Sequence, residues 1–159
     1  MSRKTVDDLL AEARRRIAPR LRPEETLEAM RRGTLLVDLR SVDERRRHGI
    51  VPGSLHIPRS VLEWRVDPES GSTNPAVGGF DRELVLFCAE GYSSSLAAAS
   101  LQELGFSRAT DLVGGFTAWK EAGLPVRAAS ESDSFADGEL PGMRPPDSLD
   151  PDVADRANG

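Results

Sequence analysis

The chain contains few of the residues from which metal sites and disulfide frameworks are built. Its 159 residues include one cysteine and two histidines, and aromatic residues make up 5% of the sequence. A single cysteine excludes an internal disulfide and a thiolate-rich metal cluster. No acid or cysteine stands at metal-ligand spacing around His48 or His56, so we expect both histidines to be structural and predict no metal site.

Long hydrophobic runs are also missing. No apolar stretch approaches the roughly 18 residues that a membrane span needs. The first four residues, Met1 to Lys4, lead into acidic residues rather than an apolar run, which is not the pattern of a signal peptide. We therefore expect a cytoplasmic protein without a membrane partner, in which a lone thiol stays reduced.

The negative charge is concentrated at the C-terminal end of the chain. The whole sequence carries −5, but residues 128–159 carry −6 and residues 1–127 carry +1. The last 32 residues are also rich in Pro, Gly, Ser and Asp and have few apolar side chains. Such a segment buries too little surface to offset its ordering entropy. We predict a disordered acidic tail over 128–159.

Two runs of arginine stand out in the remaining part of the chain, at residues 14–16 and 45–47. A basic run can bind nucleic acid, but a solvated helix face is its commoner explanation. Since residues 1–127 are nearly neutral, we interpret both runs as exposed helix faces and expect no nucleic-acid partner.

The N-terminal residues have the pattern of two helices. Thr5-x-x-Asp8 resembles a capping box, and apolar residues recur at helical spacing from there to Ile17. Pro23 suits the first position of a second helix, which Gly33 would end. We predict an N-terminal helical extension over 1–22.

Short apolar runs then alternate with helical segments, which is typical of an α/β fold with a parallel sheet. We expect Trp64 and Trp119 to be core aromatics on short helices, and Gly114 and Gly115 to form a tight strand-to-helix turn. The expected strands are 34–39, 54–57, 84–87 and 109–112, and the expected helical segments between and after them are 60–65, 94–104 and 116–121.

Cys88 stands where an expected strand ends and a helix of small residues begins. Unpaired N–H groups and the positive end of the helix dipole favour a thiolate there, and the thiolate is the nucleophile. Gly91 permits a tight curl, and the serines that follow can cap the helix. The alternative is a buried cysteine that acts as a small hydrophobe. Because active crevices of parallel sheets lie at the carboxyl ends of strands, Asp38 is expected nearby.

Four segments stand out in order along the chain: Leu36–Glu44, His48–Pro58, the cysteine loop Cys88–Ser94, and Leu112–Trp119. They resemble the "DVR…E", "GHIPGA…NIP", cysteine-loop and "LxGGxxxW" motifs of a single-domain rhodanese, the family of persulfide-forming sulfurtransferases. The resemblance runs from about Pro23 to Val126, so we predict a rhodanese-like domain over 23–127. It implies a rhodanese-like three-layer fold, with a central parallel sheet flanked by helices.

The resemblance implies that Cys88 attacks a sulfur donor such as thiosulfate, becomes a persulfide and passes the sulfur to a thiol acceptor, without a cofactor. No feature demands more than a monomer, although a protein partner is compatible with the sequence. Asp38 and Arg40 would support the loop or its adjoining turns, or form an ordinary ion pair. The active-site loop would comprise Ala89, Glu90, Gly91, Tyr92, Ser93 and Ser94.

The cysteine loop departs from the family pattern Cys-x-x-Gly-x-Arg, because Ser93 stands where the family has the arginine that binds an anionic donor. Glu90 adds a negative charge, which would raise the pKa of the thiol and repel a dianion. We therefore expect thiosulfate to be a poor donor. Related phosphatases need an arginine at the position of Ser94, so phosphatase activity is not expected. Tyr92 either lines the entrance or packs against it.

Two other functions remain open at the level of sequence. The chain can be a non-catalytic binding module that keeps the fold and holds a partner through its loop or tail. It can also be a redox or persulfide sensor, in which Cys88 is modified without turnover. The retained cysteine favours catalysis, and the missing arginine favours the two alternatives.

Overall fold

The structure is a computed structural model and describes residues 2–133. Most of the predicted tail therefore lies outside the described residues, and its disorder stays a prediction. The secondary-structure elements are α1 (Val6–Ile17), α2 (Pro23–Arg31), β1 (Leu35–Asp38), α3 (Val42–His48), β2 (Leu55–His56), a 3-10 turn (Arg59–Val61), α4 (Leu62–Val66), β3 (Leu84–Phe87), α5 (Ser93–Leu104), β4 (Ala109–Asp111) and α6 (Gly115–Glu121).

The four strands form one parallel sheet in the order β2-β1-β3-β4. The predicted α/β class and central parallel sheet are thus confirmed. Asp38, the last residue of β1, pairs with Phe87, the last residue of β3, so Cys88 and Leu39 leave the sheet side by side at its carboxyl edge. This register brings the expected cysteine loop and the Asp38 turn to the same edge.

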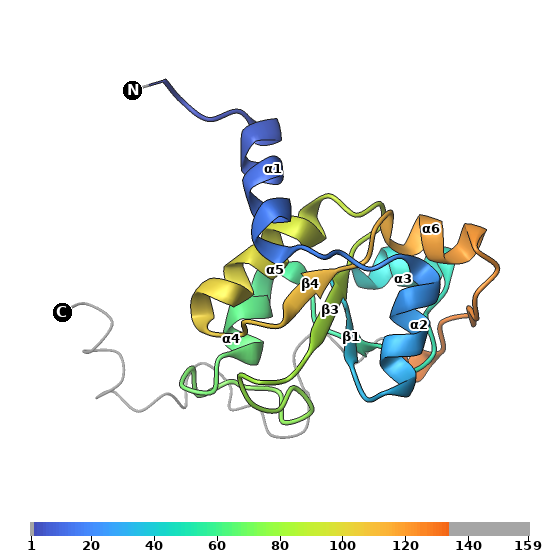
Figure 1. Ribbon diagram of the computed structural model, residues 1–159. Helices are drawn as coiled ribbons and strands as arrows, with labels where there is room; N and C mark the ends of the chain where they lie inside the picture. Colours follow the sequence, from blue (N-terminus) through green and yellow to red (C-terminus); the bar gives the residue numbers. More distant parts are fainter. Residues whose placement is uncertain (1, 134–159) are drawn as a thin grey trace.

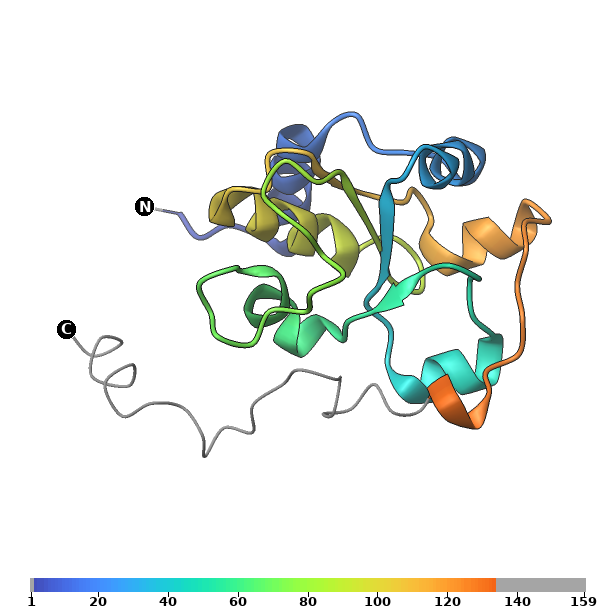
Figure 2. The same ribbon diagram turned by 90° about the horizontal axis from the view of Figure 1, so that it is seen from below.

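Helices cover both faces of the sheet (Figures 1 and 2). Side chains alternate along each strand, so Leu84 and Leu86 of β3 face one helical layer and Val85 and Phe87 face the other. The first layer contains α1, α4 and α5, and the second contains α2 and α6. The continuous apolar run in β3 is what a strand buried on both faces requires.

The N-terminal extension packs on the domain rather than standing apart from it. Its helix α1 begins with the predicted capping box of Thr5 and Asp8 and lies along α5. At the other end, Ile50 pairs with Arg127 in a short antiparallel bridge, and Arg127 forms an ion pair with Asp133. The first residues of the expected tail therefore make contacts with the domain. Within residues 2–133, no helix is long and apolar enough to cross a membrane.

The expected burial of Trp64 and the expected exposure of Arg45 are both wrong. Trp119 is buried as expected, with 1% of its surface exposed, but Trp64 is 61% exposed. The helix α4 that carries Trp64 has only five residues, and it buries Leu62 and Val66 instead. Arg45 is also not on an exposed face, because only 4% of it is accessible. The pattern of charges could not reveal that Arg45 turns inward to a buried carboxylate.

Candidate active site

Cys88 follows directly on β3 and opens a tight loop that leads into α5. The thiol is largely enclosed, with 9% of the residue exposed. The N–H of Gly91 donates to Sγ at 3.2 Å. The cysteine therefore lies at the N-terminal end of a twelve-residue helix, whose dipole favours a negative sulfur.

The surroundings of Cys88 favour the thiolate. Burial raises the pKa of the thiol, but hydrogen bonds from the hydroxyls of Ser93 and Ser94 and from the N–H groups of Ser94 and Gly91 outweigh burial and bring the pKa below its ordinary value. The Ser94 hydroxyl has one proton and also donates to Asp111 at 2.8 Å. No competing acceptor for the Ser93 hydroxyl is among the hydrogen bonds observed within residues 2–133, and that hydroxyl is the largest of the effects that lower the thiol pKa.

Glu90 does not have the effect on the thiol that we expected from the sequence. Its side chain is exposed to solvent, and it is not among the groups that set the pKa of Cys88. The predicted rise in thiol pKa is therefore wrong. Its negative charge still lies beside the opening to Cys88, where it bears on the approach of an anionic donor.

The first two carbonyl groups of the loop form hydrogen bonds with the start of α6. Phe116 and Thr117, at the start of α6, donate their N–H groups to the carbonyls of Cys88 and Ala89 at 2.9 and 3.0 Å. Since those carbonyls are held by α6, they do not face the thiolate. The Gly114–Gly115 turn is therefore part of the site, which the sequence did not reveal.

Glycine is required where that turn meets the cysteine loop. Gly91 has φ +84°, and a Cβ on it would lie 2.8 Å from the backbone nitrogen of Gly114. Gly115 has φ +60°, and a Cβ there would lie 2.5 Å from the carbonyl oxygen of Cys88. Any side chain at either position would push the two loops apart.

Ser94 and Ser95 have a different role from the capping that we predicted. Both are fully buried, and their hydroxyls donate to Asp111 at 2.8 and 2.7 Å. The N-cap of α5 is Tyr92, which makes no side-chain cap bond. Asp111 also pairs with Arg20 at 2.7 Å, so a buried carboxylate joins the start of α5 to the N-terminal segment.

The predicted solvated face of α1 is wrong for Arg14. The guanidinium of Arg14 donates to the carbonyl of Gly91 at 2.9 Å and to the hydroxyl of Ser95 at 3.2 Å. It also lies over the ring of Tyr92, 5.6 Å from the ring centre. Arg20 reaches the same Gly91 carbonyl at 3.1 Å. Two arginines from outside the expected domain thus contact the cysteine loop.

Asp38 and Arg40 form a buried network beside the loop. Arg40 pairs with Asp38 through two nitrogens, at 3.0 and 2.9 Å, and Arg45 donates to the same carboxylate at 3.2 Å. Arg40 also donates to the carbonyl of Gly49 at 2.9 Å and lies 3.9 Å from the ring centre of Phe116. The network therefore holds the turns that adjoin the cysteine loop, and hydrogen bonds from it to residues 88–94 are not among those observed within residues 2–133.

Two shallow cavities flank the loop. One of about 400 Å³ reaches Cys88 and is lined by Arg59, Glu90, Tyr92 and Ser93, among others. The other, of about 390 Å³, lies over Phe116 and is lined by His48 and Lys120 at its polar rim. Tyr92 is 61% exposed, which favours the interpretation that it lines the entrance. A substrate can therefore approach Cys88 from solvent.

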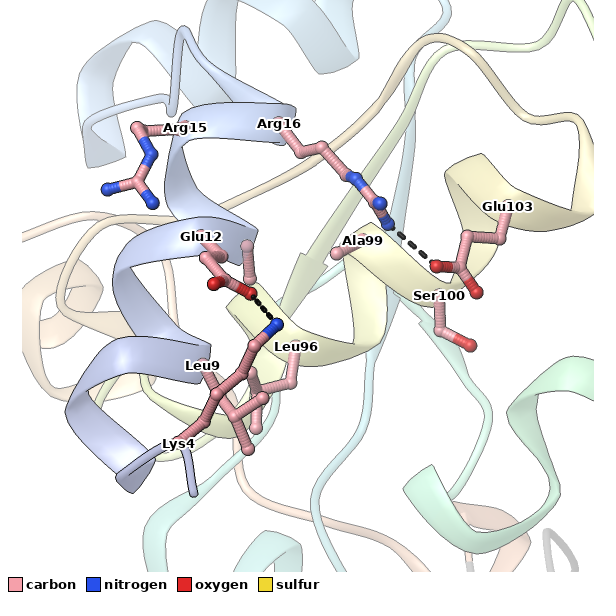
Figure 3. Close-up of a pocket in the computed structure, with 10 residues that line it drawn as sticks. Lys4, Leu9, Glu12, Arg15, Arg16, Leu96, Ala99, Ser100 and Glu103 are labelled. Atoms are coloured by element: carbon pink, nitrogen blue, oxygen red, sulfur yellow. Dashed lines mark hydrogen bonds and ion pairs between the residues drawn. The ribbon is translucent and has the colours of Figure 1, made fainter. Parts of the chain in front are cut away.

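Another surface depression lies away from the cysteine. It has a volume of about 740 Å³ and lies between α1 and α5 (Figure 3). Its charged groups are largely paired with one another, as in Lys4–Glu12 and Arg16–Glu103, which are 2.8 and 2.7 Å apart. It does not contain the cysteine, and we assign no chemistry to it. Within residues 2–133, no cluster of three or more His, Cys, Asp or Glu residues could hold a metal ion.

Comparison with known proteins identifies the class of domain that this fold and cysteine loop define. The model of the rhodanese-like domain family matches residues 22–122, and the chain belongs to that family. A sulfurtransferase from Allochromatium vinosum is 35% identical over 94 residues, which cover 59% of this chain and 78% of the relative. The thiosulfate sulfurtransferase GlpE from Haemophilus influenzae is 29% identical over 108 residues, which cover 67% of this chain and 92% of the relative.

Solved structures show the same fold. A protein of unknown function from Rhodopseudomonas palustris, described as a possible tyrosine phosphatase, superposes with a TM-score of 0.72 and 32% identity, over 80% of this chain and 97% of that one. The human single-domain sulfurtransferase TSTD1 has a TM-score of 0.56 and 29% identity, over 65% of this chain and 96% of that one. The rhodanese-like fold predicted from the motifs is therefore confirmed.

Proposed function

We propose that this protein is a sulfurtransferase or sulfur carrier that forms a persulfide on Cys88 and passes the sulfane sulfur to a thiol acceptor. The observation that carries the proposal is the Cys88 thiol, whose pKa is lowered by hydrogen bonds from its own loop and which borders an open cavity. Membership of the rhodanese-like family and the relatives named sulfurtransferases support the same class of reaction.

The reaction has two steps, and the loop assists both. The Cys88 thiolate attacks the outer sulfur of a donor; a Cys–S bond to that sulfur forms, and the donor leaves with the electron pair of the broken S–S bond, as sulfite when the donor is thiosulfate. An acceptor thiolate then attacks the terminal sulfur and releases the Cys88 thiolate. The negative charge on sulfur is stabilised each time by the N–H of Gly91 and the hydroxyl of Ser93.

The charges around the opening favour a donor with less negative charge than thiosulfate. Ser93 supplies a hydroxyl where an arginine would bind a dianion, and Glu90 places a carboxylate beside the opening. The guanidinium of Arg59 lies on the same rim, but it is paired with Glu63. A small or protein-bound persulfide carries at most one negative charge on its sulfur, so it meets less repulsion than the thiosulfate dianion.

Intact-protein mass spectrometry tests this function directly. The full chain is incubated with thiosulfate and, separately, with a small persulfide, with Cys88→Ser as the control. We expect the native protein to gain one sulfur atom, faster from the persulfide, and to lose it when a thiol acceptor is added. No gain from either donor would refute the proposal and favour a binding module. A gain that no acceptor removes would favour a persulfide sensor.

Phosphatase activity is a second candidate only because the Rhodopseudomonas palustris structure is described as a possible tyrosine phosphatase. The loop of this chain has serines at positions 93 and 94, and Ser94 is buried against the carboxylate of Asp111. A transferring phosphoryl group needs a guanidinium or a metal to offset its charge. Hydrolysis of p-nitrophenyl phosphate that Cys88→Ser abolishes would reverse this assignment.

A further inference from the structure

The carbonyl oxygen of Gly91 accepts hydrogen bonds from two arginines, and the hydroxyl of Ser95 also reaches it at 3.4 Å. Arg14 and Arg20 both donate to it, at 2.9 and 3.1 Å. The N–H of the same residue donates to Sγ of Cys88. Gly91 is therefore fixed on both sides, with two guanidinium groups on its carbonyl and the reactive sulfur on its amide.

Two cations on one carbonyl repel each other unless a carboxylate offsets one of them. Asp111 does so for Arg20, which it binds through two oxygens at 2.7 and 3.2 Å. In the described part of the chain, Arg14 has no carboxylate partner, and its contacts are the Gly91 carbonyl, the hydroxyl of Ser95 and the face of Tyr92. One uncompensated positive charge therefore lies on the cysteine loop.

Both arginines precede the part of the chain that the family model matches, which begins at residue 22. They reach the loop because α1 packs along α5 and the chain then crosses to β4 (Figure 1). The loop position at which the resemblance to the family implies an arginine is Ser93 in this chain. The positive charge missing from the loop thus has a counterpart in the preceding segment.

We propose that Arg14 and Arg20 are positioning residues for sulfur transfer: they hold the Gly91 carbonyl so that the N–H of Gly91 stays aimed at Cys88 Sγ. This inference rests on the proposed function, since it concerns the reactivity of the same cysteine. Neither arginine contacts the sulfur, so both act through the backbone of Gly91. The N-terminal helix then helps to position the cysteine loop, in addition to packing against α5.

Arg14 is the better residue for a test, because Arg20 neutralises a fully buried carboxylate and its loss would endanger folding. The variants are Arg14→Ala and Arg14→Lys, with Arg15→Ala as the matched control. Arg15 lies on the same helix, is exposed, and makes no hydrogen bond or ion pair among those observed in residues 2–133. Lysine keeps the charge of Arg14 but cannot bridge Gly91 and Ser95 with a planar fork.

The first readout is the pH dependence of iodoacetamide alkylation, which reports on Cys88 alone because it is the only cysteine. We expect Arg14→Ala to raise the apparent pKa of the thiol by about half a unit or more, and to slow alkylation and persulfide formation at pH 6 about three-fold or more. Arg14→Lys should lie between Arg14→Ala and the native chain, and Arg15→Ala should match the native chain. Thermal unfolding verifies that each variant is folded.

An unchanged pKa and loading rate in folded Arg14→Ala would overturn the inference. Should that variant fail to fold, Arg14→Lys decides by the same readouts, and a native profile in it counts against the inference. Alkylation does not depend on any sulfur donor. A protein that never forms a persulfide would refute the proposed function, while the alkylation profile would still decide the role of Arg14.

Discussion

Replacing Ser93 by arginine should make thiosulfate a better donor for this protein. Ser93 is exposed at the first turn of α5 and lines the cavity that reaches Cys88. An arginine there would place a guanidinium beside the sulfur, opposite the carboxylate of Glu90. A dianionic donor gains a charge-assisted contact from this change, whereas a persulfide, with at most one negative charge, gains less.

The size of the effect follows from the exposure of the site. A hydrogen bond to a charged group contributes about 1.5–3 kcal/mol when enclosed, and an exposed ion pair about 0.2–1 kcal/mol. A position at the rim lies between these limits, so we expect about 1–2 kcal/mol, or roughly 5- to 30-fold in kcat/KM for thiosulfate. The substitution also removes the Ser93 hydroxyl that helps to lower the pKa of Cys88. That loss would slow both donors at low pH.

The assay compares sulfur loading of Cys88 from thiosulfate, a dianion, and from a small persulfide, which carries a single negative charge at about pH 9, where the Cys88 thiolate also dominates. Ser93→Gln is the matched control, because it lengthens the side chain without adding charge. The ratio of the two rates should shift toward thiosulfate in Ser93→Arg only. An unchanged ratio would refute the argument that the absence of a loop arginine sets the donor preference.

Three further outcomes follow from the structure. Because the pKa of Cys88 is lowered in the folded state, its thiolate contributes stability that is fully present above about pH 8.5 and lost as the pH falls through the folded pKa. The pH midpoint of iodoacetamide alkylation should therefore be lower in the native chain than in the same chain unfolded in urea. Equal midpoints would contradict this expectation. Trp119→Ala should lower the free energy of unfolding by about 3–5 kcal/mol in urea titrations, and Trp64→Ala by about 0.5 kcal/mol or less, so equal losses would refute the assignment of the core. Asp38→Asn should cost about 3–5 kcal/mol in the same titrations, since Arg40 and Arg45 would be left buried without their carboxylate, and a native unfolding midpoint would show that the network is not needed for folding.

Much of this fold could be predicted from the sequence because its signals are local. A continuous apolar run specifies a strand buried on both faces, as in Leu84–Phe87, and a proline or glycine marks where a helix begins or ends, as at Pro23 and Gly105. Cys88 could be placed at the carboxyl edge of the sheet by the same reasoning. Each of these inferences uses neighbours within a few residues, and the structure confirms them.

The contacts that could not be predicted join residues far apart in the chain. Arg14 and Gly91 are 77 residues apart, and no local pattern distinguishes Arg14 from the exposed arginines beside it. The burial of Arg45 could not be predicted for the same reason, because its partner, the buried carboxylate of Asp38, belongs to another element. A run of like charges in the sequence does not show which of its side chains are buried, because the direction of each side chain depends on the tertiary structure.

The structure separates two tasks that a loop arginine would combine, namely stabilising the thiolate and attracting an anionic donor. The first task is met here without the arginine, by the N–H of Gly91 and the hydroxyl of Ser93. The second has no such replacement at the opening, where Glu90 adds a negative charge. Under the proposed function, an activated cysteine with no free cation at its opening should react best with a donor that brings less negative charge than thiosulfate. We therefore expect the missing arginine to change which donor is preferred and to leave Cys88 available as the nucleophile.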